Sequence, residues 1–173
     1  MTALVGLQFN LIWGTRLMDK GNRVRWENVA FAELTLERLY ELLRLRVDVF
    51  VVEQACAYPE LDGKDTLPET RHLLGLDAEG QIIAYARVLA PGVSYPQASI
   101  GRVIVAESAR GGGVAKLLMQ QAIAIAKQAW QGRGIQIGAQ EHLRQFYQDL
   151  GFRSVSEVYL EDGIPHLDML LKD

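Results

Sequence analysis

The alternation of apolar and polar positions divides the chain into short strands and amphipathic helices. Runs rich in Val, Ile, Tyr and Phe that are bounded by turn residues predict strands. The expected strands cover residues 24–31, 72–76, 81–89, 99–105, 135–139, 152–159 and 166–171. Asp77-Ala78-Glu79-Gly80, between two of these runs, is a hairpin turn signal. A sheet of several short strands is therefore expected.

Apolar residues at helical spacing predict helices between these strands. Thr35 is a suitable N-cap for the first helix, and residues 49–52 predict a second short helix or a turn. The expected apolar face of the first helix consists of Leu36, Leu39, Tyr40, Leu43 and Val47. A long helix is expected over residues 114–129, and a short one over 142–150 that stops at Gly151. This order of elements predicts an α/β sandwich with a mixed sheet.

Residues 53–70 are expected to form a long loop because Pro59, Gly63 and Pro68 interrupt any regular pattern. Loops of this length in compact domains are often functional. The acidic residues of this loop are Glu60, Asp62, Asp65 and Glu69. These acids either attract a cationic amine or form a solvated, charged loop.

The composition narrows the class of protein. The chain has 173 residues, a formal net charge of -3 and one cysteine, Cys56. One domain of this length needs no disulfide or metal to hold its core, and a lone cysteine excludes a disulfide framework or a Cys-cluster zinc site. The charge argues against nucleic acid as the main partner, and no apolar run is long enough to span a bilayer. A reducing compartment, and hence the cytoplasm, is expected.

Residues 1–22 differ from the rest of the chain and predict a peripheral or disordered extension before a domain over residues 23–173. An integral strand in this segment is the alternative. A secretory signal would carry Lys or Arg near its start, whereas the first basic residue is Arg16. Met18 offers an alternative start of translation.

A glycine-rich turn stands between the strand that ends at Val105 and the helix that begins at Val114. A helix N-terminus exposes unpaired N–H groups, and glycines let a phosphate approach them, so residues 110–113 predict an anion-binding turn. Arg110 and Lys116 would add positive charge. The turn matches neither a Walker A loop nor the Rossmann fingerprint. The alternative is a turn that only permits a tight strand-to-helix corner.

Two motifs, in this order along the chain, resemble the GCN5-related N-acetyltransferase (GNAT) family. They are Arg110-x-x-Gly113-x-Ala115 and Phe146-Tyr147-x-x-x-Gly151-Phe152. The resemblance implies a mixed, mostly antiparallel sheet flanked by helices, with splayed central strands, and it implies acetyl-CoA as co-substrate. The residues implied to bind acetyl-CoA are Val103, Ile104, Val105, Arg110, Gly111, Gly112, Gly113, Val114, Ala115 and Gln140.

In this family the N–H groups of the turn hold the CoA pyrophosphate, and the strand end matching residues 103–105 pairs with the pantetheine arm. Other segments resemble the ElaA-like branch of the family. They include Arg46-x-x-Val49-Phe50-Val51-Val52-Glu53-Gln54 and Glu161-Asp162-Gly163-Ile164-Pro165-His166. Many family members carry Asn where this chain has Gln140, so the Asn contact to the CoA arm does not transfer directly.

Acetyl transfer to an amine requires a base for the amine proton and an acid for the leaving thiolate. By resemblance, Tyr147 lies beside the CoA sulfur and is the expected acid; the alternative is a core aromatic residue next to Phe146. Glu53 is the expected base, buried and with a raised pKa. The alternative for Glu53 is a surface carboxylate that pairs with Arg46 or Arg87.

His72 and Cys56 are expected to contact the substrate. His72 begins a strand and is also consistent with a base or a satisfied half-buried histidine, and His142 and His166 are similar. Cys56 is expected to form part of the substrate wall and not to act as a nucleophile, because no base partner is visible. The three histidines lie far apart with no His-Glu-x-x-His pattern, so no metal is expected.

The leading hypothesis is an acetyl-CoA-dependent N-acetyltransferase that acts directly on a primary amine. The acceptor is a small-molecule amine, a peptide N-terminus or a lysine, and neither nucleic acid nor membrane is an expected partner. The alternative is a non-catalytic CoA-binding or interaction module of the same fold. A third hypothesis is a regulatory protein that binds a nucleotide at the glycine turn. The expected oligomeric state is a monomer or a homodimer.

Overall fold

One mixed sheet forms the centre of the structure, a computed structural model that describes residues 24–173. The extension expected over residues 1–22 lies outside the described residues. The spatial order of the strands is β1-β2-β3-β4-β5-β8-β6, and β7 also pairs with β8. The strands are β1 (Arg25–Val29), β2 (Arg71–Leu76), β3 (Ile82–Leu89), β4 (Ala98–Val105), β5 (Ile135–Gln140), β6 (Arg153–Ser154), β7 (Tyr159–Glu161) and β8 (Ile164–Leu171).

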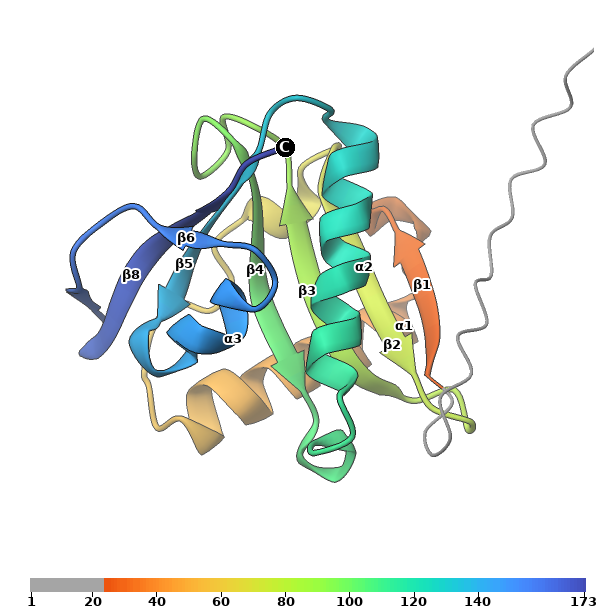
Figure 1. Cartoon of the computed structure of the whole chain (residues 1–173). Coiled ribbons are helices and arrows are strands. Elements are labelled where there is room, and N and C mark those ends of the chain that lie inside the picture. The colour runs from red at the N-terminus through yellow and green to blue at the C-terminus, as the bar shows by residue number, and fades with distance from the viewer. Residues whose placement is uncertain (1–23) are drawn as a thin grey trace, which may run out of the picture.

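The central strands β4 and β5 run parallel and then part from each other. In the described chain they pair at two positions, Ala98 with Ile135 and Ser99 with Gln136, whereas every other strand pair is antiparallel. Beyond Ser99 the two strands diverge (Figure 1), so their facing edges carry backbone groups that need other partners. The predicted mixed, mostly antiparallel sheet with splayed central strands is confirmed.

A β-bulge changes the direction of β4 just beyond its last pair with β5. Arg102 has a φ of +53°, and the pairing between β3 and β4 shifts in register between Tyr85 and Arg87. Bulges re-aim side chains and increase local twist. This bulge brings Arg102 and Val103 to the wall of the cavity between β4 and β5.

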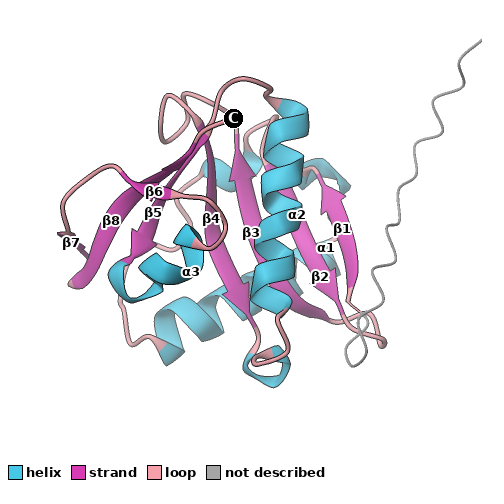
Figure 2. Ribbon diagram, in the orientation of Figure 1, coloured by secondary structure: helices cyan, strands magenta, loops and turns pink. Residues whose placement is uncertain are grey.

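Helices cover both faces of the sheet (Figures 1 and 2). α2 (Val114–Ala129) and α3 (Arg144–Gln148) lie in front of the sheet in this view, and α1 (Leu36–Arg46) lies behind it. The side chains that α2 buries in the core are Val114, Leu118, Met119, Ala122 and Ala126. Short 3₁₀ turns cover Phe31–Glu33, Lys64–Thr66, Glu107–Ala109 and Glu141–Leu143. No helix within residues 24–173 has the length and apolar character to cross a membrane.

The buried face of α1 differs from the predicted one. Leu36 is 81% exposed and Tyr40 is 73% exposed, whereas Leu42 and Arg46 are fully buried. The hydrophobic pattern predicted the wrong face because it assigns a charged residue such as Arg46 to the surface. Here the carboxylates of Glu60 and Asp65 compensate the buried guanidinium of Arg46. The Thr35 cap is confirmed, since its Oγ1 accepts a hydrogen bond from a backbone N–H of the first turn. α1 continues into a π-helical segment, Val47–Glu53.

The strand predicted over residues 152–159 is interrupted and forms two short strands, β6 and β7. Residues 155–158 between them are exposed. There the Ser156 hydroxyl accepts a hydrogen bond from the Asp168 N–H at 2.8 Å, in the place of a backbone carbonyl. A side chain that competes with the backbone for a strand partner ends the ladder. The remaining predicted strands agree with the observed ones to within a few residues at their ends.

Candidate active site

The gap between β4 and β5 opens into a cavity of about 680 Å³. Its walls come from the parted strands, from residues 54–64, from residues 93–95 and from the β7–β8 hairpin. The lining residues with the chemistry most relevant to catalysis are Cys56, Asp62, Arg102, Gln140, Tyr147 and His166. A cavity of this size, with a few polar groups, suits a small organic substrate.

Some of the predicted site residues meet at this cavity and others do not. Cys56, Val103, Gln140 and Tyr147 line it, although they come from four different elements of the chain. Glu53 and His72 are not part of its described wall, and neither are residues 110–115. Among residues 24–173, no three His, Cys, Asp or Glu side chains gather as a metal site requires.

The glycine-rich turn forms the N-terminal end of α2, close to the end of β4 (Figure 1). Gly111 and Gly113 have φ values of +84° and +79°, which residues with a Cβ adopt only at a cost. A Cβ placed on any of residues 111–113 would meet no atom within 4 Å, so the turn faces open space. Within the described structure, the N–H groups of residues 111–115 donate to no protein acceptor. The turn therefore presents several donors to an anion.

Glu53 is not the buried base that the sequence predicts. Its carboxylate accepts two hydrogen bonds from Arg110, both at 2.7 Å, and its side chain is 46% exposed. The hydrogen bonds from Arg110 hold the pKa of Glu53 below its ordinary value, which is the opposite of the expected shift. The alternative, a surface ion pair, is correct, but its partner is Arg110 and not Arg46 or Arg87. The pair ties the end of the π-helical segment to the glycine turn.

Tyr147 combines core packing with a place at the cavity wall. Its ring meets Phe146 and Phe152 edge to face, with centroids 5.1 Å and 6.0 Å apart. The residue is almost completely buried, and this burial raises the pKa of its phenol to about 12. The phenol therefore stays protonated at neutral pH, as a proton donor must. The core-aromatic alternative agrees with this packing, and the role of Tyr147 as the acid stays a prediction.

His72 is a core histidine and does not line the cavity, so this structure gives no support to its predicted substrate contact. It is fully buried, with Nδ1 2.9 Å from the Tyr85 hydroxyl and Nε2 3.0 Å from the Asp65 carbonyl oxygen. Because a carbonyl only accepts, Nε2 carries the proton and Nδ1 accepts from Tyr85. Burial lowers the pKa of His72 and favours the neutral ring.

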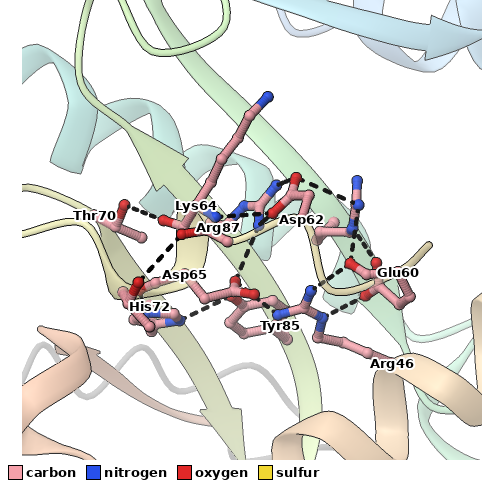
Figure 3. A network of polar contacts seen from close by, with 12 residues as sticks. Arg46, Glu60, Asp62, Lys64, Asp65, Thr70, His72, Tyr85 and Arg87 are labelled. Carbon is pink, nitrogen blue, oxygen red and sulfur yellow. Dashed lines mark hydrogen bonds and ion pairs between the residues drawn. The ribbon is translucent and has the colours of Figure 1, made fainter.

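Buried ion pairs replace the solvated, charged loop that the sequence predicts for residues 53–70 (Figure 3). The Arg46 guanidinium donates to a Glu60 carboxylate oxygen at 2.5 Å and to Asp65 Oδ1 at 2.8 Å. Burial by itself lowers the pKa of Arg46, but the hydrogen bonds to Glu60 and Asp65 outweigh it, so the pKa is raised and the group stays charged. These bonds tie α1 to the loop that forms one cavity wall.

Arg87 on β3 and Arg102 on β4 complete this network. Arg87 donates to both carboxylate oxygens of Asp62 at 2.7 Å and to Asp65 at 3.0 Å, and Arg102 donates to Glu60. Burial raises the pKa of Asp62, but its hydrogen bonds from Arg87 dominate and hold that pKa well below the ordinary value. The buried acids are therefore paired with arginines and do not form an open attraction site for a cationic amine.

Two further contacts at the cavity have no signal in the sequence. Gln140 Nε2 donates to Gln54 Oε1 at 3.2 Å and links the end of β5 to the residue after the π-helical segment. On the far side, the Tyr95 and Tyr159 hydroxyls both donate to Asp168 Oδ1, at 3.1 Å and 3.0 Å. Gln54 and Gln140 are 86 positions apart and Tyr95 and Asp168 are 73 apart, so only the fold brings them together.

The parted parallel strands, the bulge in β4 and the open turn before α2 define this chain as having the acyl-CoA N-acyltransferase fold. A family model described as an acetyltransferase (GNAT) domain matches residues 46–172. The chain belongs to the GNAT acetyltransferase family, as the two sequence motifs predict.

The relatives of this chain support the same assignment. Protein ElaA of Escherichia coli (strain K12) is 43% identical over 146 residues, which make up 84% of this chain and 95% of ElaA. An acyl-CoA N-acyltransferase from Pseudomonas aeruginosa is 44% identical, with a TM-score of 0.81, covering 86% of this chain and 99% of that one. The CoA-dependent acyl-homoserine lactone synthase BjaI, solved with SAM and isopentyl-CoA, shares the fold with a TM-score of 0.68 at 17% identity. The match covers 86% of this chain and 83% of the BjaI chain. The resemblance to the ElaA-like branch is confirmed.

Proposed function

We propose that this protein is an N-acetyltransferase that uses acetyl-CoA and transfers the acetyl group directly to a primary amine. One observation carries the proposal: β4 connects an open turn of unpaired N–H groups to a cavity that contains a buried tyrosine, Tyr147. The turn suits a diphosphate, and the parted edge of β4 suits an extended arm that needs backbone partners.

The donor has a specific set of proposed contacts. The N–H groups of Gly111, Gly112, Gly113, Val114 and Ala115 hold the diphosphate, because the Arg110 guanidinium is already engaged by Glu53. Residues 103–105 pair with the pantetheine arm. Gln140 lies at the wall that this arm passes.

The proposed reaction proceeds without a covalent acyl-enzyme. The neutral amine attacks the thioester carbonyl carbon, and a backbone N–H on the parted edge of β4 stabilises the developing oxyanion. The carbon–sulfur bond then breaks, and the Tyr147 hydroxyl gives its proton to the leaving thiolate. Cys56 lines the cavity, and its thiol lies 3.8 Å from a backbone carbonyl, with no base as partner in the described structure. We therefore assign it to the acceptor wall.

The acceptor proposed here is a small-molecule amine, a peptide N-terminus or a lysine side chain. All three present a primary amine on a flexible stem to the cavity. The single thiol and the use of acetyl-CoA favour the cytoplasm as the place of action.

Calorimetry with acetyl-CoA and ATP in parallel, followed by an amine panel that monitors free CoA, tests this function. We expect acetyl-CoA to bind more tightly than ATP, and at least one primary amine to accelerate CoA release. Binding without release for any amine would instead indicate a non-catalytic CoA-binding module, and tighter binding of ATP a nucleotide-binding regulator. Acetylated Cys56 during turnover, detected by mass spectrometry, would contradict direct transfer.

A further inference from the structure

We infer that His166 is the base that removes the proton from the acceptor amine. This inference rests on the proposed transfer to an amine and adds the residue that the transfer lacks, because Glu53 is exposed and bound to Arg110. His166 lies on β8, where the β5–β8 register places it directly opposite Gln140. Directly opposed residues project from the same face of a sheet, and both line the cavity together with Tyr147.

The hydrogen bonding of His166 leaves one nitrogen available as a base. Its Nδ1 lies 2.9 Å from the carbonyl oxygen of Ile164. A carbonyl only accepts, so Nδ1 carries the proton and, in the neutral ring, Nε2 keeps its lone pair. No protein group in the described structure is hydrogen-bonded to this Nε2. His72 shows the opposite arrangement, with both ring nitrogens bonded inside the core.

The ring of His166 is held in place from β7. It stacks on Tyr159, its strand partner, with centroids 6.3 Å apart and an interplanar angle of 26°. The Tyr159 hydroxyl is in turn fixed by Asp168 at 3.0 Å. A base must stay within hydrogen-bond reach of the proton it removes, so an oriented ring favours this role.

Other titratable groups near His166 are less suited to accept the proton. The phenols of Tyr147 and Tyr159 have raised pKa values because both are partly or fully buried, so they are protonated at neutral pH. Asp62, at the far wall, is bound through both oxygens by Arg87. Glu161 and Asp162 of the β7–β8 hairpin also line the cavity, and the Cys56 thiol of the 54–64 loop lies against the Asp162 carbonyl. A carboxylate is an intrinsically weaker base than an imidazole.

The proton inventory of the step is balanced. The acceptor arrives as an ammonium ion and gives one proton to Nε2 of His166, which leaves a neutral amine as nucleophile. The new C–N bond forms, and the nitrogen loses a second proton as the C–S bond breaks. One of the two protons replaces the one that Tyr147 gives to the thiolate, and the other passes from His166 to water. The products are an amide, free CoA thiol and one released proton.

The test compares His166→Gln with His142→Gln, a matched change at an exposed histidine outside the cavity. Initial CoA release is measured from acetyl-CoA with the best amine of a panel that contains benzylamine and spermidine, and again with hydroxylamine. Hydroxylamine is largely unprotonated at neutral pH and needs no base. We expect His166→Gln to lower the rate with the basic amine about 100-fold, to remove the acidic limb of its pH profile, and to affect hydroxylamine much less. Equal losses with both nucleophiles would show a structural role and overturn the inference.

A second measurement is independent of the acceptor. Nitrogen NMR of the histidine rings at neutral pH reports which nitrogen carries the proton. We expect the Nδ1-protonated form for His166, and the Nε2-protonated form would overturn the inference whatever the activity. A wild-type protein that releases no CoA with any amine would contradict the proposed function. A wild-type rate that His166→Gln leaves unchanged would contradict only the role of His166.

Discussion

The glycine turn before α2 and the ion-pair network beneath the 54–64 loop are built in contrasting ways. The turn consists of consecutive residues, with two glycines at positive φ, open space around a Cβ and N–H groups that have no acceptor in the described structure. The network joins Arg46 and Arg87 (Figure 3), together with Arg102, from three elements to acids of a fourth segment. The N–H groups of the turn have no acceptor within the described structure, whereas the charges of the network are paired with one another.

In the proposed function, the turn binds the donor and the network shapes the cavity for the acceptor. The network holds the loop that forms one wall, and its buried charges are costly if any partner is lost. The turn contributes little to packing, so changes there should alter ligand affinity more than folding.

Replacing Arg46 by Ala should produce the largest effect, because Glu60 and Asp65 would lose a buried partner. We expect the free energy of unfolding to fall by about 3–5 kcal/mol, measured by urea denaturation. Arg44→Ala, on the exposed side of the same helix, is the control and should change it by less than about 0.5 kcal/mol. Equal, small losses in both variants would mean that the network does not hold the loop.

Tyr147→Phe should lower the turnover number about 100-fold while leaving acetyl-CoA affinity unchanged, since only the proton donor is removed. Steady-state kinetics and calorimetry measure the two quantities separately. The aromatic contacts to Phe146 and Phe152 remain, so the variant should fold normally. Tyr40→Phe, at an exposed position, is the control. An unchanged turnover number at neutral pH would remove Tyr147 from the acid role.

Gly113→Ala should weaken acetyl-CoA binding about tenfold, or about 1.4 kcal/mol, because the methyl group lies where the diphosphate approaches. Gly132→Ala is a matched control, since Gly132 has a φ of +72° and, like Gly113, open space around a Cβ. Both variants should lose a similar stability of about 1 kcal/mol from backbone strain. Calorimetry measures the acetyl-CoA affinity of the two variants. An equal loss of affinity in both would contradict the proposal that the glycine turn binds the diphosphate.

The stability of the protein should also depend on pH through His72. Burial lowers its pKa in the folded state, so the unfolded chain binds a proton first as the pH falls below the ordinary value of 6.5. The contribution of His72 to the free energy of unfolding is therefore present above pH 6.5. It declines below that pH by at most about 1.4 kcal/mol per pH unit. Urea unfolding from pH 8 to pH 5 should show a shallower decline in His72→Gln than in His142→Gln. Parallel slopes would exclude this coupling.

The sequence predicted those parts of the site that depend on neighbouring residues. The Thr35 cap, the strand before the turn, the glycine-rich turn itself and the start of α2 are all local signals, and each agrees with the structure. The prediction that Glu53 is a buried base failed because its ion-pair partner, Arg110, lies 57 positions away in the sequence. The position of Glu53 at the end of an apolar run gives no sign of that partner. The sequence does not distinguish the roles of His72, His142 and His166. Only tertiary contacts show that both ring nitrogens of His72 are hydrogen-bonded inside the core, whereas His166 has one such bond.

The prediction for α1 failed for a physical reason as well. Hydrophobic periodicity treats Arg46 as a surface residue, and burying a guanidinium is unfavourable until carboxylates surround it. Those carboxylates belong to the loop of residues 53–70. The pattern of polar residues does not predict the path of this loop. Leu36 and Tyr40, which the pattern assigned to the core, are exposed as a result.

A crystal structure of the protein with acetyl-CoA would show whether the glycine turn before α2 binds the diphosphate of the donor. We expect diphosphate oxygens within hydrogen-bond distance of the N–H groups of residues 111–115, and the thioester sulfur in the β4–β5 gap beside the Tyr147 hydroxyl. A coenzyme bound elsewhere, or backbone N–H groups of the turn that bind the protein's own carboxylates in its presence, would contradict this expectation.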